Sequence, residues 1–241
     1  MYRYCIGSSE LFGIKLPENF NTPFFSKTIP EFWRRWHITL NKWFINYIYI
    51  PLGGSRKGKI RTYINIMIIF IISGLWHGAA WTYFIWGVLN GIYSCWYRIL
   101  DNDLKVVLEK FRKIFRLNPE TLIYKVIQMF ITFGLTCFAF IFFRAESIDQ
   151  AISMIKSIPN FTSTIGNLGL TSTSEYLITL ITLGMLFAVS VLKQKYDIRK
   201  EISKQHVIVR YIIWISLIVI ILLFGYYGVG YDSSNFIYQK F

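Results

Sequence analysis

The chain has 241 residues, and its 26 Lys and Arg outnumber its 13 Asp and Glu, which gives a formal net charge of +13. Hydrophobic residues make up 54% of the sequence and charged residues only 16%, whereas about a quarter of a typical soluble domain is charged. This balance excludes a disordered chain, a collagen-like chain and a disulfide scaffold, and the long uncharged apolar runs argue against a nucleic-acid binder. The sequence therefore predicts an all-α, polytopic membrane protein that forms a single membrane domain over residues 1–241.

The first predicted element is an amphipathic helix over residues 27–50. Residues 28–31 (Thr-Ile-Pro-Glu) have the pattern of a capping box with proline in the first turn. Aromatic side chains then recur at helical spacing, while Arg34 and Arg35 fall mostly on the other side. Because helices rich in Trp and Arg lie in the headgroup plane of a membrane, this helix is expected to be interfacial.

The next predicted element is an apolar stretch, residues 62–97, that is too long for one membrane pass. A helix over Tyr63–Tyr97 would be roughly 50 Å long at about 1.5 Å per residue, while the hydrocarbon core is about 30 Å thick. Gly74 and Gly78 flank His77 in the middle of this stretch. The sequence predicts two helices that meet near His77, either as a re-entrant pair or as a hairpin that crosses the membrane.

Three later apolar runs have about the length that a membrane span needs. They cover Tyr124–Phe143, Tyr176–Leu192 and Ile208–Val229. A second amphipathic helix is predicted over Ser147–Ile158. With the broken pair, the chain has about five predicted membrane helices.

Basic residues predict how these helices are oriented, because Lys and Arg gather in cytosolic loops. Arg34–Arg61, Arg98–Arg116 and Lys193–Arg210 are rich in Lys and Arg, whereas Arg144–Glu175 carries few. The first three segments are therefore expected in the cytosol and the fourth outside. Much of the positive charge is a topology signal.

Cysteine usage and the N-terminus exclude some further classes. Cys5, Cys95 and Cys137 are odd in number and widely spaced, so they predict neither a disulfide framework nor a metal site. The N-terminus has no apolar core region, so no cleavable signal peptide is expected there.

His77 is the strongest candidate for chemistry. It lies in a stretch without Lys or Arg, where an ionisable group is costly and functional by default. The alternative is a neutral imidazole that only hydrogen-bonds between helices. No Asp or Glu occurs from Phe32 to Leu100, so a lone histidine base, walled by the tryptophans Trp76, Trp81 and Trp86, is the chemistry that this stretch predicts.

The other two histidines are weaker candidates. His37 falls on the aromatic side of the predicted interfacial helix, and packing at the headgroup level is the favoured interpretation from its position alone. His206 lies beside Lys204 in a basic segment and is predicted to be a solvated surface residue. Gly53 and Gly58-Lys59 match part of a phosphate-binding loop, but Ile60 stands where Ser or Thr would hold Mg²⁺, so a cytosolic turn is preferred.

Four short segments, in order, resemble the membrane-bound O-acyltransferase family. They are Pro-Glu-Asn-Phe-Asn at 17–21, Phe-Trp-Arg-Arg-Trp-His-Ile-Thr-Leu at 32–40, Tyr-Ile-Pro-Leu-Gly-Gly-Ser-Arg-Lys-Gly at 49–58 and Gly-Leu-Trp-His-Gly-Ala-Ala-Trp at 74–81. The resemblance is to the bacterial alginate O-acetyltransferase branch rather than the teichoic-acid D-alanylation branch, and Phe224-Gly225 also resembles its C-terminal helix.

The resemblance implies the C-terminal part of that fold, with His77 as the catalytic histidine and His37 as the second motif histidine. It implies transfer of an acyl group, usually acetyl, from a cytosolic thioester such as acetyl-CoA to hydroxyls of an exported polysaccharide. The donor is a co-substrate, and no bound cofactor or metal is expected. Trp76 and the basic residues Arg34, Arg35, Arg56 and Lys57 are candidates for donor binding, with interfacial anchoring as the alternative for the basic residues.

The resemblance also implies a location and partners. The location is the bacterial inner membrane, in contact with lipid, with a polysaccharide acceptor, a periplasmic acetyltransferase partner and no nucleic acid. Family members are about twice as long, so a missing N-terminal half is expected. Two other interpretations stay open: a non-enzymatic transporter or channel-like protein with His77 as a relay, and an inactive or partner-dependent fragment.

Overall fold

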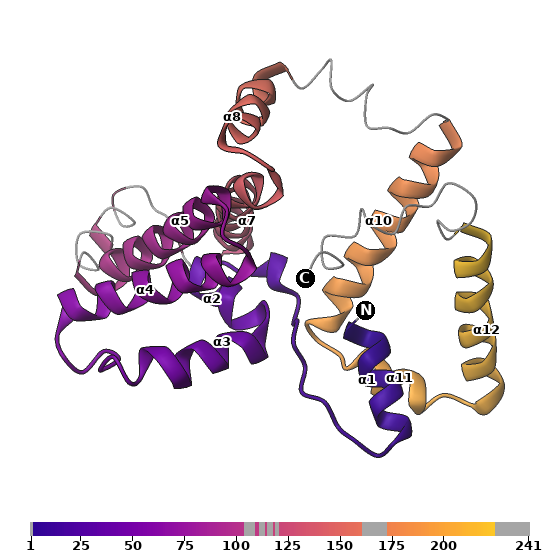
Figure 1. Cartoon of the computed structure of the whole chain (residues 1–241). Helices are drawn as coiled ribbons and strands as arrows, with labels where there is room; N and C mark the ends of the chain where they lie inside the picture. Colours follow the sequence, from indigo (N-terminus) through magenta and orange to yellow (C-terminus); the bar gives the residue numbers. More distant parts are fainter. Residues whose placement is uncertain are drawn as a thin grey trace. The chain divides into compact units, whose positions relative to one another are not determined.

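The computed structural model describes residues 2–103, 109, 110, 114, 118, 121–160 and 173–224. Within these residues the chain is helical and contains no strand, which confirms the all-α prediction. The chain divides into two compact units, residues 1–175 and 176–241 (Figure 1). The single membrane domain over residues 1–241 stays a prediction.

The first unit begins with short helical elements. They are α1 (Tyr2–Leu11), the 3-10 helix η1 (Pro23–Phe25), α2 (Ile29–Arg35), α3 (Ile38–Phe44) and the π-helix η2 (Ile45–Tyr49). The predicted cap at the start of α2 is present, because the Thr28 hydroxyl accepts from the backbone N–H of Glu31 at 3.2 Å. The Glu31 carboxylate in turn accepts from the backbone N–H of Lys27 at 2.8 Å. Side-chain acceptors thus satisfy N–H groups that the first helical turn leaves free.

The prediction of one continuous helix over residues 27–50 is wrong. The chain leaves the helix at Trp36, and His37 adopts a left-handed conformation with φ 48° and ψ 51° before α3 begins. Few non-glycine residues take this conformation, although His is among those that do so more often. The side-chain amide of Asn41 stabilises the break, since it donates to the carbonyls of Trp33 at 2.6 Å and Trp36 at 2.5 Å.

The predicted break near His77 is confirmed. Helix α4 (Lys59–His77) ends at His77, Gly78 has φ 152°, and α5 (Trp81–Arg98) follows. The two helices lie side by side and antiparallel (Figure 1). At about 1.5 Å per residue each is roughly 28 Å long, so the pair fits either form of the prediction, re-entrant or crossing.

Glycines bring the backbones of α4 and α5 together. A Cβ atom on Gly74 would meet the carbonyl oxygen of Tyr83, and one on Gly87 would meet that of Phe70. A Cβ atom on Gly91 would lie 2.6 Å from the Met67 sulfur. Small residues at helix contacts permit this close approach, which is typical of helices that pack inside a membrane.

The remaining helices of the first unit follow α5. They are the π-helix η3 (Ile99–Asp103), α7 (Leu122–Arg144), α8 (Ile148–Ser157) and the 3-10 helix η4 (Ile158–Asn160). Helix α7 packs against α5 and also contacts α2, η1 and α8. The Ser147 hydroxyl caps α8 by accepting from the backbone N–H of Gln150 at 3.1 Å, so the second predicted amphipathic helix is present.

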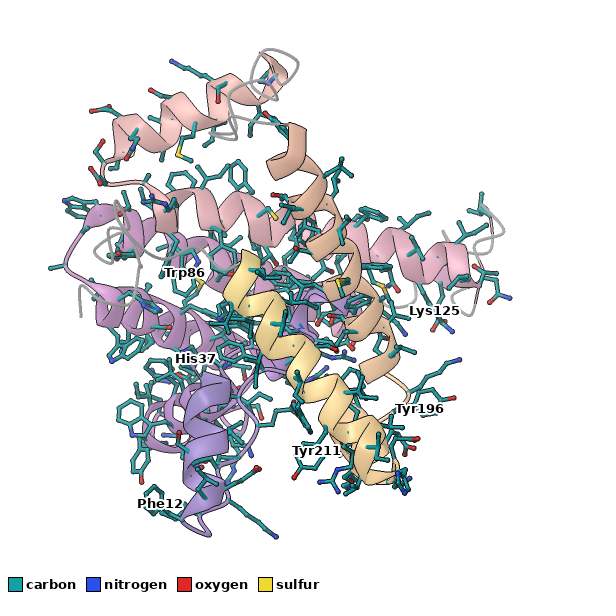
Figure 2. The ribbon with its side chains drawn as sticks, turned by 90° about the vertical axis from the view of Figure 1, so that its right-hand side faces the viewer. Phe12, His37, Trp86, Lys125, Tyr196 and Tyr211 are labelled. Carbon is teal, nitrogen blue, oxygen red and sulfur yellow. The ribbon has the colours of Figure 1, made fainter. Side chains whose placement is uncertain are left out.

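The second unit contains most of α10 (Thr173–Lys193), with α11 (Ile198–Ser203) and α12 (Val207–Phe224). The predicted spans from Tyr176 and from Ile208 coincide with α10 and α12. The end of the latter prediction, like Gly225, lies outside the described residues. Apolar side chains are exposed all round both helices, and Tyr211, labelled in Figure 2, is 64% exposed.

Small polar side chains are buried beside apolar ones in the first unit, while many large apolar side chains of the described residues are exposed. Several side chains buried among the helices of the first unit are small and polar, namely Thr62, Asn65, Ser73, Thr82, Asn90, Ser94, Thr132 and Thr136. Three described helices are long and apolar enough to cross a membrane, Lys59–His77, Leu122–Arg144 and Tyr176–Lys193, and Val207–Leu223 is a shorter apolar helix. Together these features show a polytopic membrane protein.

Replacement of Gly87 by Ala is expected to destabilise the α4–α5 pair by about 1–3 kcal/mol, because the new Cβ atom has to displace the backbone of α4. Gly134→Ala in α7 is the matched control, since a Cβ atom there would meet no atom beyond its own stretch of helix within 4 Å. Ala at this position gains helix propensity. Thermal unfolding of the purified variants in detergent measures both. Equal unfolding temperatures for the two variants would contradict the close backbone contact.

Candidate active site

His77 lies at the tip of the α4–α5 hairpin, enclosed by aromatic rings. Its side chain is only 7% exposed. The Trp86 ring of α5 meets the imidazole at a centroid distance of 5.4 Å, and the Phe143 ring of α7 does so at 4.8 Å, both nearly perpendicular. Tyr83 lies 6.1 Å away. An imidazole in such surroundings is shielded from water.

The three tryptophans that the sequence places around His77 have different positions. Trp86 is 2% exposed and contacts His77 as expected. Trp76 also contacts it, at 4.7 Å, but is 55% exposed. Trp81 is 70% exposed and packs on Phe84 instead, so its predicted place in the wall is wrong.

Tyr83 and Phe143 complete the wall, and the sequence did not indicate either of them. Tyr83 is six residues from His77 along the chain, and only the hairpin geometry brings the two rings together. Phe143 comes from α7, which packs against α5. No periodicity within residues 62–97 could have shown that contact.

His37 is held at the break between α2 and α3 (Figure 2). Its Nδ1 atom lies 3.2 Å from the side-chain nitrogen of Asn19, and its ring lies 5.3 Å from that of Phe20. The backbone carbonyl of Asn19 also accepts a hydrogen bond from the backbone N–H of Ile38 at 2.9 Å. The segment at 17–21 therefore packs directly on the break.

The two histidines interact electrostatically. A series of aromatic contacts also joins the two histidines: Phe20 to Trp36 at 5.0 Å, Trp36 to Phe140 at 5.7 Å, and Phe140 to Phe143 at 6.0 Å. The contacts of His37 with Asn19 and Phe20 agree with the packing interpretation.

Burial lowers the pKa of His37 from its ordinary value of 6.5, because a partly dry environment disfavours the charged imidazolium. His37 lies between α2 and α3, outside the helices long enough to span a membrane. At neutral pH its imidazole is therefore uncharged. His206 is exposed, as the sequence predicts.

Of the four basic residues predicted to bind the donor, Arg34 lines a cavity beside α2 and α3. It shares this cavity of about 460 Å³ with Lys42 and Arg98, which the sequence analysis did not single out. Arg35 points elsewhere, to Glu31 at 2.6 Å and to the Thr22 hydroxyl at 3.3 Å. Arg56 and Lys57 lie exposed in the turn after η2 and do not line the cavity.

The cavity wall is mainly apolar, and two of its lining residues each have a buried polar atom that makes no hydrogen bond. Trp33 and Ser94 both line it. The indole N–H of Trp33 and the hydroxyl oxygen of Ser94 are buried without a hydrogen-bond partner. None of the residues that line the cavity is acidic. An apolar wall, a cationic side and unpaired polar groups suit an amphiphile that carries negative charge.

Comparison with known proteins shows what this part of the chain is similar to. Residues 2–96, which contain all four motif segments, match the sequence model of the membrane-bound O-acyltransferases. This part of the chain is therefore similar to the membrane-bound O-acyltransferase family. Two of its motifs meet at Asn19 and His37, and a third supplies His77.

Curated relatives of the chain are named for acyl transfer to peptidoglycan, alginate or teichoic acid. A peptidoglycan O-acetyltransferase of Helicobacter pylori is 40% identical over 158 residues, which cover 64% of this chain and 28% of the relative. A probable alginate O-acetylase of Azotobacter vinelandii is 35% identical over 81% of this chain and 35% of the relative. A teichoic acid D-alanyltransferase of Bacillus subtilis is 33% identical over 59% of this chain and 36% of the relative.

The chain thus spans about a third of the length of these curated relatives. Identity is higher to the two O-acetylating relatives than to the D-alanyltransferase, in line with the branch that the motifs resemble. The match with the family model covers the short helices before α4, α4 itself and nearly all of α5. It therefore includes both His37 and His77.

The lowered pKa of His37 predicts a pH dependence of stability. The unfolded chain takes up a proton near pH 6.5, whereas folded His37 does so only at a lower pH, so the unfolded state binds more protons in between. Stability is therefore present above about pH 6.5 and is lost as the pH falls toward the folded pKa. His37→Asn, which tolerates the left-handed backbone, is expected to remove this part of the loss.

Thermal unfolding of the wild type and of His37→Asn at about pH 7.5 and about pH 5.5 measures the effect. The wild type is expected to lose more stability than the variant between the two pH values. The same loss in both proteins would contradict a buried, neutral His37.

Proposed function

We propose that this protein is the catalytic part of a membrane O-acyltransferase that moves an acyl group, most simply acetyl, from a cytosolic thioester to a hydroxyl of an exported polysaccharide. The observation that carries the proposal is the position of His77, buried among Trp86 and Phe143 at the tip of a hairpin without a nearby acidic residue in the sequence. A shielded imidazole is suited to act as a general base on a hydroxyl.

In the proposed reaction, His77 takes the proton of the acceptor hydroxyl while its oxygen attacks the thioester carbonyl carbon. The new C–O bond forms, the C–S bond breaks, and the sulfur leaves as a thiolate that recovers the proton from the imidazolium. Each turnover then returns His77 to its neutral form. His37, which interacts electrostatically with His77, is proposed to position the reacting groups.

The donor is proposed to enter through the cavity beside α2 and α3. A thioester such as acetyl-CoA combines phosphates with an apolar arm, and Arg34, Lys42 and Arg98 offer cations beside an apolar wall. Of the basic residues predicted to bind the donor, the proposal therefore keeps Arg34, and Trp76, which contacts His77, also stays a candidate for substrate or donor binding. Arg35 is engaged by Glu31, while Arg56 and Lys57 lie outside the cavity, and anchoring at the membrane surface remains their proposed role.

The topology signals in the sequence and the polymers named in the relatives' names support a proposal for the location and the partners. We place the protein in the bacterial inner membrane, surrounded by lipid, with a cell-envelope polysaccharide as the acceptor. A periplasmic acetyltransferase partner belongs to the same proposal, as does dependence on the parts of the relatives that this chain does not match. The transporter alternative needs charged residues inside several spans, and the interiors of α7 and α10 offer none.

His77→Ala is expected to lower acyl transfer by about 100-fold or more, because it removes the general base, without changing membrane insertion. Acetyl incorporation into exopolysaccharide by cells that produce the protein measures the effect. Trp81→Phe is the control, since Trp81 is exposed and packs away from His77. Activity of His77→Ala at the wild-type level would refute the assignment.

The cavity predicts which cations act on the donor. Arg34→Gln and Arg98→Gln are each expected to raise the KM for the donor by about tenfold, because each removes a charged hydrogen-bond donor from the cavity. Arg56→Gln, outside the cavity, is the matched control and is expected to leave KM unchanged. Initial rates over a range of donor concentrations test this, and equal effects of all three substitutions would contradict the proposed donor cavity.

Dependence on unmatched segments is tested by the same assay. The chain is produced alone and together with the N-terminal portion of the Helicobacter pylori relative that lies outside the match. Activity only in the second case supports a partner-dependent catalytic part. Activity in neither, with both chains inserted in the membrane, favours an inactive protein.

A further inference from the structure

We infer that Asn19 is a positioning residue that fixes His37 as the neutral tautomer with its proton on Nε2. The inference concerns the protonation state of one imidazole, and its use in catalysis rests on the proposed function. His37 then carries a hydrogen-bond donor at Nε2, whereas His77 serves as the base. The two histidines have different chemical roles because their neighbours differ.

The orientation of the Asn19 amide is set by Thr39. The Oδ1 atom of Asn19 accepts from the backbone N–H of Thr39 at 3.0 Å and from its hydroxyl at 2.9 Å. A backbone N–H can only donate, so the atom that faces it has to be the amide oxygen. The amide nitrogen therefore faces His37.

The tautomer of His37 follows from this orientation. The Nδ2 atom of Asn19 lies 3.2 Å from Nδ1 of His37, and an amide nitrogen can only donate. Nδ1 therefore presents its lone pair, and a neutral imidazole carries its proton on Nε2. A protonated His37 would place two donors face to face at this distance.

The backbone around the break keeps Asn19 in place. Its carbonyl accepts from the backbone N–H of Ile38, and the N–H of Asn21 donates to the carbonyl of Arg35, each at 2.9 Å. These bonds join the segment to both sides of the break at His37. Asn19 is 8% exposed, so water does not compete freely for its amide.

Other neighbours of His37 do not reverse this arrangement. The ring of Phe20 packs against it at 5.3 Å and carries no titratable group. His77, from α4, is the titratable group that interacts with it electrostatically, and a charge on either imidazole disfavours a charge on the other. The pKa of His37, lowered by burial, agrees with a neutral ring.

The wild-type protein provides the first test. The sequence contains 3 His, so selective ¹⁵N-histidine labelling of the protein in lipid nanodiscs gives an interpretable spectrum. His206→Gln and His77→Gln assign the signals by subtraction. At neutral pH the ¹⁵N shifts of His37 are expected to show a bare Nδ1 and a protonated Nε2. A protonated Nδ1 would overturn the inference without any variant of Asn19.

Asn19→Asp provides the second test, because it preserves the shape of the side chain and reverses its chemistry. One carboxylate oxygen can still accept from Thr39, while the other faces Nδ1 of His37 and accepts a hydrogen bond from it once Nδ1 is protonated. The proton is expected to move to Nδ1, and the titration midpoint of His37 is expected to rise by about one to three pH units. An unchanged tautomer and midpoint would overturn the inference.

Thr39→Val is the matched control. It removes the hydroxyl bond to Asn19 but keeps the backbone N–H that orients the amide, so His37 is expected to keep its proton on Nε2. A tautomer change in this variant would show that packing, rather than the Asn19 amide, sets the proton. All these readouts are independent of acyl transfer, so a failure of the proposed function and a failure of this inference are distinguishable.

Discussion

The close backbone contact between α4 and α5 is the constraint on which the rest of the structure depends. The helices approach until the backbone of one meets that of the other at Gly74 and at Gly87. Gly91 leaves room for the side chain of Met67. The contact makes α5 the wall on which α7 packs, and it places Trp86 beside His77. The buried site therefore begins with three residues that have no side chain.

The second histidine is held in a different way. His37 sits where a helix is interrupted, and backbone groups freed by an interruption have to find partners, above all near a membrane. Asn41 and Asn19 provide these partners from opposite sides of the break. Two asparagines thus fix the backbone at His37, and the glycine contacts between α4 and α5 fix the backbone at His77.

The sequence predicts the local features of this arrangement and misses those that depend on contact between distant segments. The break at His77 follows from length and from Gly78, and the cap at Thr28 follows from a four-residue pattern. Helical periodicity across residues 27–50 concealed the break at His37, because one of the two residues that stabilise it, Asn19, lies 18 residues before His37. Arg98 likewise lines the same cavity as Arg34 only once α5 has packed against α2, and Lys42 joins them from α3.

The positions of the glycines also restrict how the hairpin can move. Each glycine faces one particular group on the opposite helix, and a slide by one helical turn, about 5.4 Å, would bring larger side chains into the narrow contact. The pair therefore resists shear and behaves as a rigid body along its axis. Any motion that admits a substrate to His77 is then confined to the parts of the wall that other helices supply, α7 with Phe143 foremost.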